Sequence, residues 1–262
     1  MPLPALAAPE LALSGRFRQG GFAIGRTDRG AKAFLDGQPV GPVSDDGYFF
    51  VGFDRDAGPR AEVRVKGRLT QASRDLDIGR ASYDVQRIKG IRRVYEGQAD
   101  AELEARIAEE TRRKAAAFAS RIEGDYFREG FAAPLRDFRV TARFGGQRII
   151  DGRARPPHYG IDLAAPRGTP VHAPAGGTVV LADPRMLFEG GMIMIDHGQG
   201  LVSAYLHLSA VDAHQGQRIR RGERIGAVGA TGRATGSHLC WRLKWRGRNM
   251  NPMLLVGVPG PA

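Results

Sequence analysis

The chain has 262 residues, of which 42% are hydrophobic and 26% charged, a composition typical of folded rather than disordered proteins. No apolar run approaches the roughly 18–20 residues of a transmembrane helix, so we expect a protein that does not span a membrane. The net charge of +11 would suit a nucleic-acid partner. However, only five of the 39 basic residues are lysines, and the arginines are scattered without interleaved aromatic residues, so we expect no nucleic acid.

The first residues resemble the end of a secretory signal. Segment 4–9 consists of small residues and prolines and contains Ala5-Leu6-Ala7, which matches the A-x-A pattern of a cleavage site. Export is one interpretation of this segment, and a flexible tail is the other. The single cysteine of the chain, Cys240, excludes an internal disulfide.

Residues 10–97 are predicted to form a small antiparallel β-sandwich that serves as an accessory domain. Short strands are expected at 31–35, 48–53 and 61–65, and Asp-Gly or Lys-Gly pairs mark turns beside them. This region contains no histidine, so we expect a structural or binding role there rather than chemistry.

Residues 98–125 are predicted to hold one linking amphipathic helix. Asp100 is the expected N-cap, and a stop is expected at Gly124. The spacing predicts an apolar face made of Leu103, Ile107, Ala115, Phe118 and Ile122. The helix is interpreted as a spacer, with a partner-binding helix as the alternative.

Residues 130–258 return to short strands and tight turns, and all six histidines lie in this half of the chain. Strands are expected at 140–144, 178–182, 192–195 and 201–207, with a hairpin turn at 197–200. Any chemistry of the protein is therefore expected here.

A strictly alternating strand at 236–245 carries the first candidate ligands. One face is apolar and belongs in a core, with Leu239, Trp241, Leu243 and Trp245. The opposite face presents His238, Cys240, Arg242 and Lys244. An imidazole and a thiol one pleat apart are a potential pair of metal ligands.

A second pair is His158 and Asp162, whose even separation puts both on one side of an extended segment. His207 lies in a predicted strand in which Tyr205 and Ser209 share its face. Together these residues predict a site with His158, Asp162 and Cys240 as three metal ligands. His207 and His238 would then handle protons. Three protein ligands with one open position are how a catalytic zinc is held.

The same segments resemble those of the lysostaphin-type (LytM-type) peptidoglycan metalloendopeptidases. The resemblance covers about residues 130 to 257 and rests on His158-x-x-x-Asp162, segment 205–209, segment 235–240 and the glycine turns at 165–171 and 173–177. It implies a mostly antiparallel β fold with an open groove and zinc-dependent cleavage of peptide bonds in cell-wall peptidoglycan. It also implies that His158 and Asp162 are Zn²⁺ ligands and that His207 and His238 are catalytic.

Cys240 departs from the family pattern, because family members carry a histidine here as the third zinc ligand. Zinc accepts thiolate sulfur, but the added negative charge makes the metal a weaker Lewis acid. The site is therefore active but retuned, selective for another metal, or a relic. We favour retained zinc, because every other catalytic position is present.

The sequence thus favours an exported zinc endopeptidase of the periplasm or cell envelope that acts on cross-links or stems of peptidoglycan. The alternative is a degenerate, non-hydrolytic member that binds cell wall or activates a partner amidase, another cell-wall enzyme. His172, His197 and His214 are interpreted as structural. Tyr205 and Arg148 are candidates for lining the groove.

Overall fold

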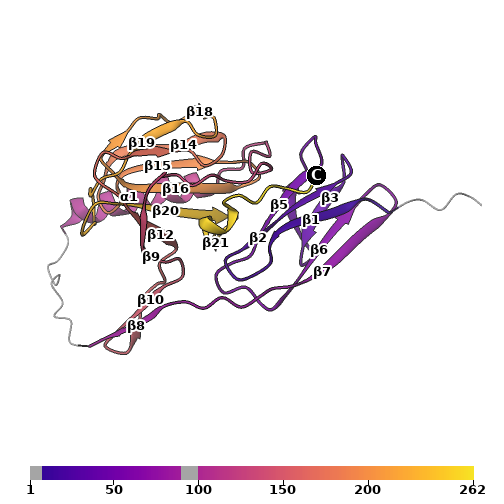
Figure 1. The fold of residues 1–262 in the computed structure, drawn as a ribbon, viewed down its shortest axis with the longest axis horizontal. Coiled ribbons are helices and arrows are strands. Elements are labelled where there is room, and N and C mark those ends of the chain that lie inside the picture. Colours follow the sequence, from indigo (N-terminus) through magenta and orange to yellow (C-terminus); the bar gives the residue numbers. More distant parts are fainter. Residues whose placement is uncertain (1–7, 90–99) are drawn as a thin grey trace, which may run out of the picture.

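The computed structural model describes residues 8–89 and 100–262, and the Ala5-Leu6-Ala7 pattern lies outside them. The chain is mainly β, with one α-helix in the described part, and it folds into two lobes (Figure 1). Within the described residues, none of the helices has the length and apolar character needed to cross a membrane.

The N-terminal lobe is the expected antiparallel β-sandwich. One sheet has the order β1-β2-β5 and the other the order β4-β3-β6-β7. In β6, Ala61, Val63 and Val65 point into the core while the residues between them are more exposed, because successive side chains of a strand face opposite ways. The strands are β1 Leu11–Arg16, β2 Phe22–Thr27, β3 Lys32–Leu35, β4 Gln38–Pro42, β5 Tyr48–Gly52, β6 Arg60–Lys66 and β7 Gln71–Asp77.

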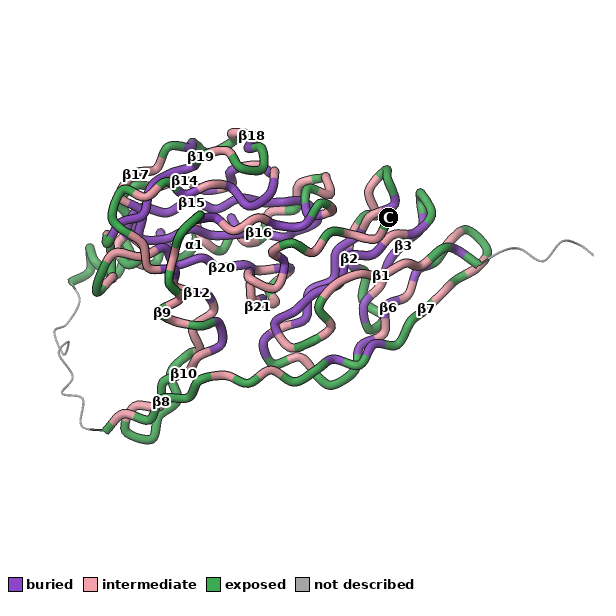
Figure 2. Tube along the Cα trace, viewed as in Figure 1, coloured by how far each residue is buried: buried purple, intermediate pink, exposed green. Residues whose placement is uncertain are grey.

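The chain then leaves this lobe through a largely exposed arm. Strand β8 (Val85–Ile88) pairs in parallel with β10 (Gln147–Ile150), which also pairs with β11 (Arg153–Ala154). Figure 2 shows the arm of β8 and β10 as exposed or half-buried, away from the buried centre. Segments about sixty residues apart in sequence thus form one small sheet.

The C-terminal lobe is built on a large antiparallel sheet of order β18-β14-β15-β16-β20-β12-β9, with β21 paired to β20. A second sheet has the order β13-β19-β17. Every residue of β15 and β16 is buried, because both faces of the sheet are covered (Figure 2). The elements are β9 Arg139–Ala142, β12 Gly160–Ala164, β13 Pro170–His172, β14 Gly177–Met186, β15 Gly190–Asp196, β16 Leu201–Leu208, β17 Ala210–Val211, β18 Arg218–Ile219, β19 Arg224–Ala227, β20 His238–Trp245, β21 Arg248–Met250 and the 3₁₀-helix η1 Pro252–Leu255.

Helix α1 (Ala101–Phe118) begins as expected, since the Asp100 carboxylate accepts the N–H of Leu103 at 2.7 Å. The helix ends before the expected stop. Its expected apolar face is correct only in part: Phe118 packs against the buried cluster, but Leu103 and Ala115 are exposed. Ala117 and the carboxylate of Glu110 are buried instead.

The physical reason lies in a polar docking contact. Glu110 accepts the backbone N–H of Leu187 at 2.9 and 3.1 Å, so an acidic residue fixes the helix to the sheet. Ala117 joins an apolar cluster that includes Val202, Ala204 and Cys240, so α1 covers the sheet face to which Cys240 belongs.

The two lobes share one apolar core. The ring centroids of Phe50 and Trp245 lie 6.1 Å apart, and Phe22, Phe127 and Leu243 belong to the same cluster. The N-terminal sandwich therefore rests directly on the sheet that carries the candidate site. The boundaries 10–97, 98–125 and 130–258 stay a prediction.

Candidate metal centre

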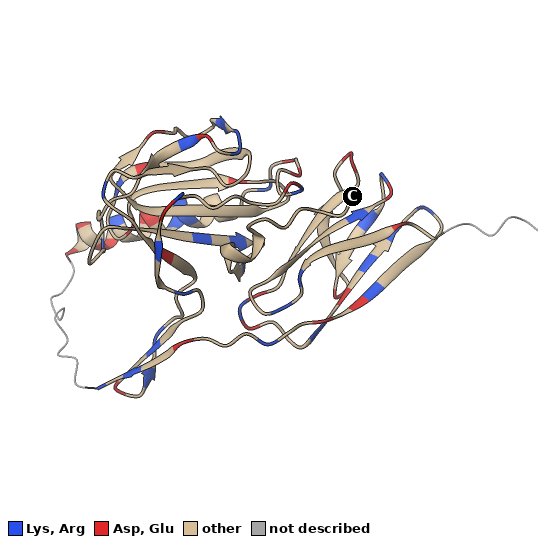
Figure 3. Ribbon diagram, in the orientation of Figure 1, with Lys and Arg blue, Asp and Glu red and all other residues tan. Residues whose placement is uncertain are grey.

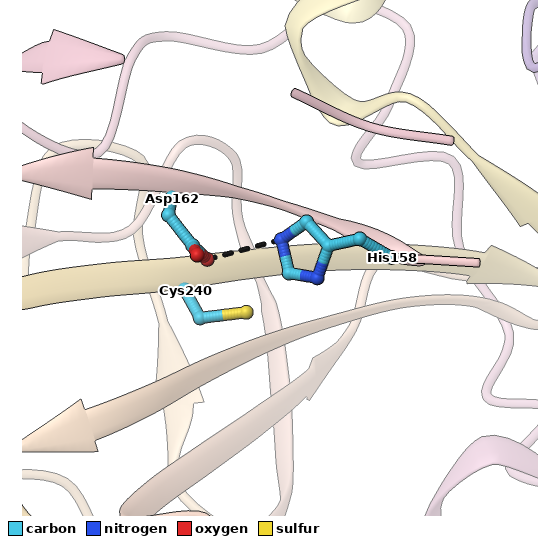
Figure 4. Close-up of side chains that lie close together, drawn as sticks. All are labelled: His158, Asp162 and Cys240. Carbon is cyan, nitrogen blue, oxygen red and sulfur yellow. Dashed lines mark hydrogen bonds and ion pairs between the residues drawn. The ribbon is translucent and has the colours of Figure 1, made fainter. Parts of the chain in front are cut away.

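Asp162 and Cys240 come from neighbouring strands of the large sheet. They are partners in the antiparallel register of β12 and β20, and such directly opposed side chains lie close together on one face. Figure 4 shows the carboxylate and the sulfur pointing into the same space. The sheet itself therefore sets the distance between these two groups.

His158 approaches from the segment that leads into β12. Its Nε2 lies 3.0 Å from Oδ1 of Asp162, so the expected orientation to one side is confirmed (Figure 4). One ligand atom each of His158, Asp162 and Cys240 lies within 4.8 Å of the others. An imidazole nitrogen, a carboxylate oxygen and a sulfur thus converge on one point.

The electrostatics of this cluster favour a positive charge at its centre. Burial alone would lower the pKa of His158, but hydrogen bonds to Asp162 and Cys240 outweigh it and raise that pKa to about 9. Burial would raise the pKa of Asp162, yet the hydrogen bond with His158 lowers it. A nitrogen, oxygen and sulfur donor set of this kind suits a divalent transition metal, which would replace the proton on His158. The residues therefore fit a metal ion.

His207 and His238 lie beside this cluster, with ring centroids 4.8 Å apart. Nδ1 of His207 donates to the carbonyl of Thr231 at 2.9 Å, and Nδ1 of His238 donates to the carbonyl of Gly236 at 2.9 Å. Because a carbonyl only accepts, each Nδ1 carries the hydrogen and each neutral ring keeps Nε2 as an acceptor. Nε2 of His238 is 3.9 Å from Asp162.

The environment keeps His207 neutral. Burial lowers its pKa, the hydrogen bond to Thr231 opposes that effect, and the nearby His238 adds to the lowering. A neutral imidazole with a free acceptor nitrogen can take up a proton near neutral pH.

The expectation that Tyr205 shares a face with His207 and lines the groove is wrong. Tyr205 is fully buried in the main core, where its hydroxyl lies 2.8 Å from that of Ser203. His207 has a φ of +67°, which breaks the alternation of the strand at this residue. The backbone turn, which residue spacing does not reveal, brings the imidazole to His238.

A cavity of about 940 Å³ opens next to the cluster. His158 and Asp162 line it, together with Arg148 of β10 and with Asp84 and Gln86 from the arm. Arg148 is thus at the groove, as expected. Asp84 and Gln86 were missed, because no local signal predicts a parallel pairing between strands so far apart in sequence.

The lining of this cavity is cationic on balance, with four arginines against the carboxylates of Asp84 and Asp162. Four arginines line it, and none of them has a carboxylate partner within the described ranges: Arg143, Arg148, Arg155 and Arg233. Figure 3 shows basic segments along the arm of β8 and β10. The cavity therefore attracts anionic groups next to the candidate metal ligands.

The remaining histidines lie away from the cluster. His197 is completely buried, with Nδ1 2.6 Å from the carbonyl of Gly176 and Nε2 2.7 Å from the hydroxyl of Ser203, and burial lowers its pKa to about 4. His172 ends β13, and His214 lies in an exposed turn. None of the three belongs to the ligand group found in the described chain.

Comparisons with known proteins point to one family. The sequence profile of peptidase family M23 matches residues 156–252. An uncharacterized metalloprotease of Haemophilus influenzae is 40% identical over 142 residues, which cover 53% of this chain and 30% of that protein. The peptidoglycan DD-endopeptidase ShyA of Vibrio cholerae is 40% identical over 117 residues, which cover 44% of this chain and 27% of that protein. The chain thus spans less than a third of the length of these relatives.

The overall architecture also has a counterpart among solved structures. A crystal structure of a Pseudomonas aeruginosa chain assigned to peptidase M23 superposes with a TM-score of 0.69 at 29% identity. The superposition covers 92% of this chain and 95% of that one, so it includes the N-terminal lobe.

Proposed function

We propose that the chain is a zinc-dependent endopeptidase that cleaves peptide cross-links or stems of bacterial peptidoglycan, because residues 156–252 match the profile of peptidase family M23. Residues 130–258 would carry the activity, residues 98–125 the linking helix and residues 10–97 an accessory domain. The observation that carries the proposal is the convergence of His158, Asp162 and Cys240 within 4.8 Å beside a cavity of about 940 Å³.

The three converging side chains are the proposed zinc ligands. Zinc accepts imidazole nitrogen, carboxylate oxygen and thiolate sulfur, and three protein ligands leave a position open for chemistry. When bound, zinc supplies a Lewis acid that polarises a carbonyl and makes a water molecule nucleophilic near neutral pH. Cys240 contributes the sulfur from the buried sheet, where its position is fixed by pairing with Asp162.

His207 and His238 are the proposed proton-handling residues. Each can accept a proton at Nε2, because its Nδ1 donates a hydrogen bond to a backbone carbonyl. One ring takes the proton of the attacking water, and its new N–H then donates to the negatively charged oxygen or to the leaving amine. The lowered pKa of His207 leaves its Nε2 unprotonated at neutral pH, as the first of these steps requires.

The arginines that line the cavity support peptidoglycan as the substrate. Stem peptides of the cell wall carry free carboxylates, and Arg148 and the neighbouring arginines have no acidic partner in the described chain. A substrate peptide that lies in the cavity would bring its carboxylates to these guanidinium groups while its scissile bond faces His158 and Asp162.

This substrate implies a location outside the cytoplasmic membrane. We therefore propose that the protein works in the periplasm or cell envelope. The A-x-A pattern at Ala5-Leu6-Ala7 agrees with export.

A zymogram with purified cell wall tests the proposal. The wild-type chain should clear the gel with added zinc and lose that activity with a chelator, and His238→Ala should not clear it. Zinc-loaded wild-type protein that binds cell wall without cutting it would overturn the endopeptidase and favour a non-hydrolytic binder. The convergence of three donor side chains beside two imidazoles counts against that alternative.

A further inference from the structure

Arg55 of the N-terminal lobe reaches across to the lobe that carries the candidate site. Its side chain is only 9% exposed. Nε and Nη2 both donate to the carbonyl oxygen of Gly145, at 3.1 and 2.8 Å. Asp56 holds the third nitrogen, Nη1, at 2.5 Å, which neutralises and orients the buried guanidinium. This contact is therefore a buried, hydrogen-bonded part of the structure and differs from a casual contact of a surface side chain.

Aromatic residues enclose the same contact. The guanidinium carbon of Arg55 lies 4.3 Å from the ring centroid of Tyr83, and the Tyr83 hydroxyl donates to the carbonyl of Arg55 at 2.9 Å. Tyr83 packs edge-on against Phe144, with centroids 6.2 Å apart. Gly145 has a φ of +81°, and a Cβ there would lie 2.2 Å from the Tyr83 ring, so only glycine admits this packing.

The turn that Arg55 contacts makes two hydrogen bonds with the backbone of His158, one to its carbonyl and one from its N–H. The N–H of Gly145 donates to the carbonyl of His158 at 2.8 Å, and the N–H of His158 donates to the carbonyl of Gly146 at 2.7 Å. A continuous chain of hydrogen bonds thus runs from the guanidinium of Arg55 through the turn to the backbone of His158.

His158 needs this support more than the other two ligands of the proposed site. Asp162 and Cys240 lie within β12 and β20, where ladder hydrogen bonds fix them. His158 precedes β12 and lies outside the strand ladders of the described residues. Its backbone position therefore depends on the turn at Gly145 and Gly146.

We propose that Arg55 is a positioning residue for His158, through which the N-terminal lobe holds the imidazole in place to bind the metal. This inference rests on the proposed metal site and gives the accessory domain a role in forming it. The contact requires the planar guanidinium, which donates to one carbonyl from two nitrogens in a fixed geometry. A lysine at this position would reach Gly145 with a single ammonium group.

The test uses the full chain and the variants Arg55→Lys and Arg55→Met. Competition with a chromophoric chelator should show zinc binding about tenfold weaker in both, the size typical of residues that orient a ligand. Arg64→Lys is the matched control, because Arg64 makes a similar two-nitrogen contact, to Glu62 within the N-terminal sheet. It should bind zinc as the wild type does.

Cobalt binding adds a readout that a general loss of stability would not change. The thiolate-to-cobalt charge-transfer band should persist in the Arg55 variants, because Cys240 is held by the sheet. The visible ligand-field bands should weaken as His158 leaves the ion. Circular dichroism shows whether each variant is folded. If Arg55→Met does not fold, the test is made with Arg55→Lys alone.

The outcomes separate the two proposals. Arg55 variants with wild-type zinc affinity and a wild-type cobalt spectrum would overturn the role of Arg55 alone. A wild-type chain that binds neither zinc nor cobalt would overturn the metal centre itself, and with it the inference.

Discussion

Asp162 and Cys240 are register partners on the adjacent antiparallel strands β12 and β20, so the sheet places a carboxylate beside a thiol. A slip of one residue in this register would turn one of the two side chains to the opposite face. The apolar alternation of β20 prevents that slip, because Trp241 and Trp245 are locked into the main core. The packing that stabilises the strand therefore also fixes the two candidate ligands.

Removal of the thiol should abolish zinc binding without unfolding the protein. Cys240→Ala deletes a single sulfur atom from a buried position, so the apoprotein should stay folded. Two ligands remain. Loss of a residue that only orients a ligand lowers metal affinity by roughly 10–100-fold, and we expect loss of the sulfur to lower zinc affinity by more than that. Dialysis followed by metal analysis, with thermal unfolding in a chelator, measures both properties. Stoichiometric zinc in Cys240→Ala would show that the sulfur is not a ligand.

Loss of His207 should separate catalysis from metal binding. His207→Ala removes an imidazole whose Nε2 is free to take a proton, and removal of such a group costs about 10²–10⁴-fold in rate. We expect cell-wall hydrolysis to fall by about that factor while zinc content stays at the wild-type level. His214→Ala, in an exposed turn, is the control and should hydrolyse normally. Full activity in His207→Ala would remove this residue from the mechanism.

Charge reversal at an arginine that lines the cavity should weaken substrate binding. Arg148→Glu places a carboxylate where we propose that stem-peptide carboxylates bind, and an exposed ionic contact contributes about 1 kcal/mol at most. We therefore expect KM on soluble peptidoglycan fragments to rise about fivefold, more at low salt, with kcat little changed. Arg16→Glu, on the exposed end of β1, controls for net charge. Equal effects of the two reversals would mean that only long-range charge matters.

His197 should make the folded state sensitive to mild acid. Its pKa is about 4 in the folded protein, below the ordinary value of 6.5, so above pH 6.5 it is neutral in both states and has no effect. Between pH 6.5 and 4 only the unfolded chain binds the proton, and stability falls by about 1.4 kcal/mol per pH unit, about 3 kcal/mol in total. Below pH 4 this loss is complete.

Urea unfolding of the metal-free protein across this pH range measures the effect. His197→Gln should be less stable than wild type at pH 7 but should show a shallower loss toward pH 4. His214→Gln should keep the wild-type slope. Identical slopes for wild type and His197→Gln would contradict the assignment.

Much of the fold and site could be predicted because the deciding signals are local. The alternation of 236–245 gives the strand and the face of Cys240, and the spacing of His158 and Asp162 gives their shared side. The N-cap at Asp100 is equally local. In each case neighbouring residues contain both the pattern and the physical reason for it.

The errors and omissions arise where distant segments meet. Tyr205 was misplaced because the positive φ of His207 breaks the alternation. Glu110 lies outside the predicted apolar face of its helix but is buried, because its carboxylate accepts the backbone N–H of Leu187. Asp84 reaches the cavity through a strand pairing between β8 and β10, and Arg55 reaches His158 through Gly145. No spacing rule within one segment reveals such contacts.

Anomalous diffraction at the zinc absorption edge, from crystals of the full chain grown with zinc, tests the central claim most directly. We predict one strong anomalous peak within bonding distance of Nε2 of His158, a carboxylate oxygen of Asp162 and Sγ of Cys240. Absence of density among these three side chains, in crystals that hold zinc at other positions, would contradict the account.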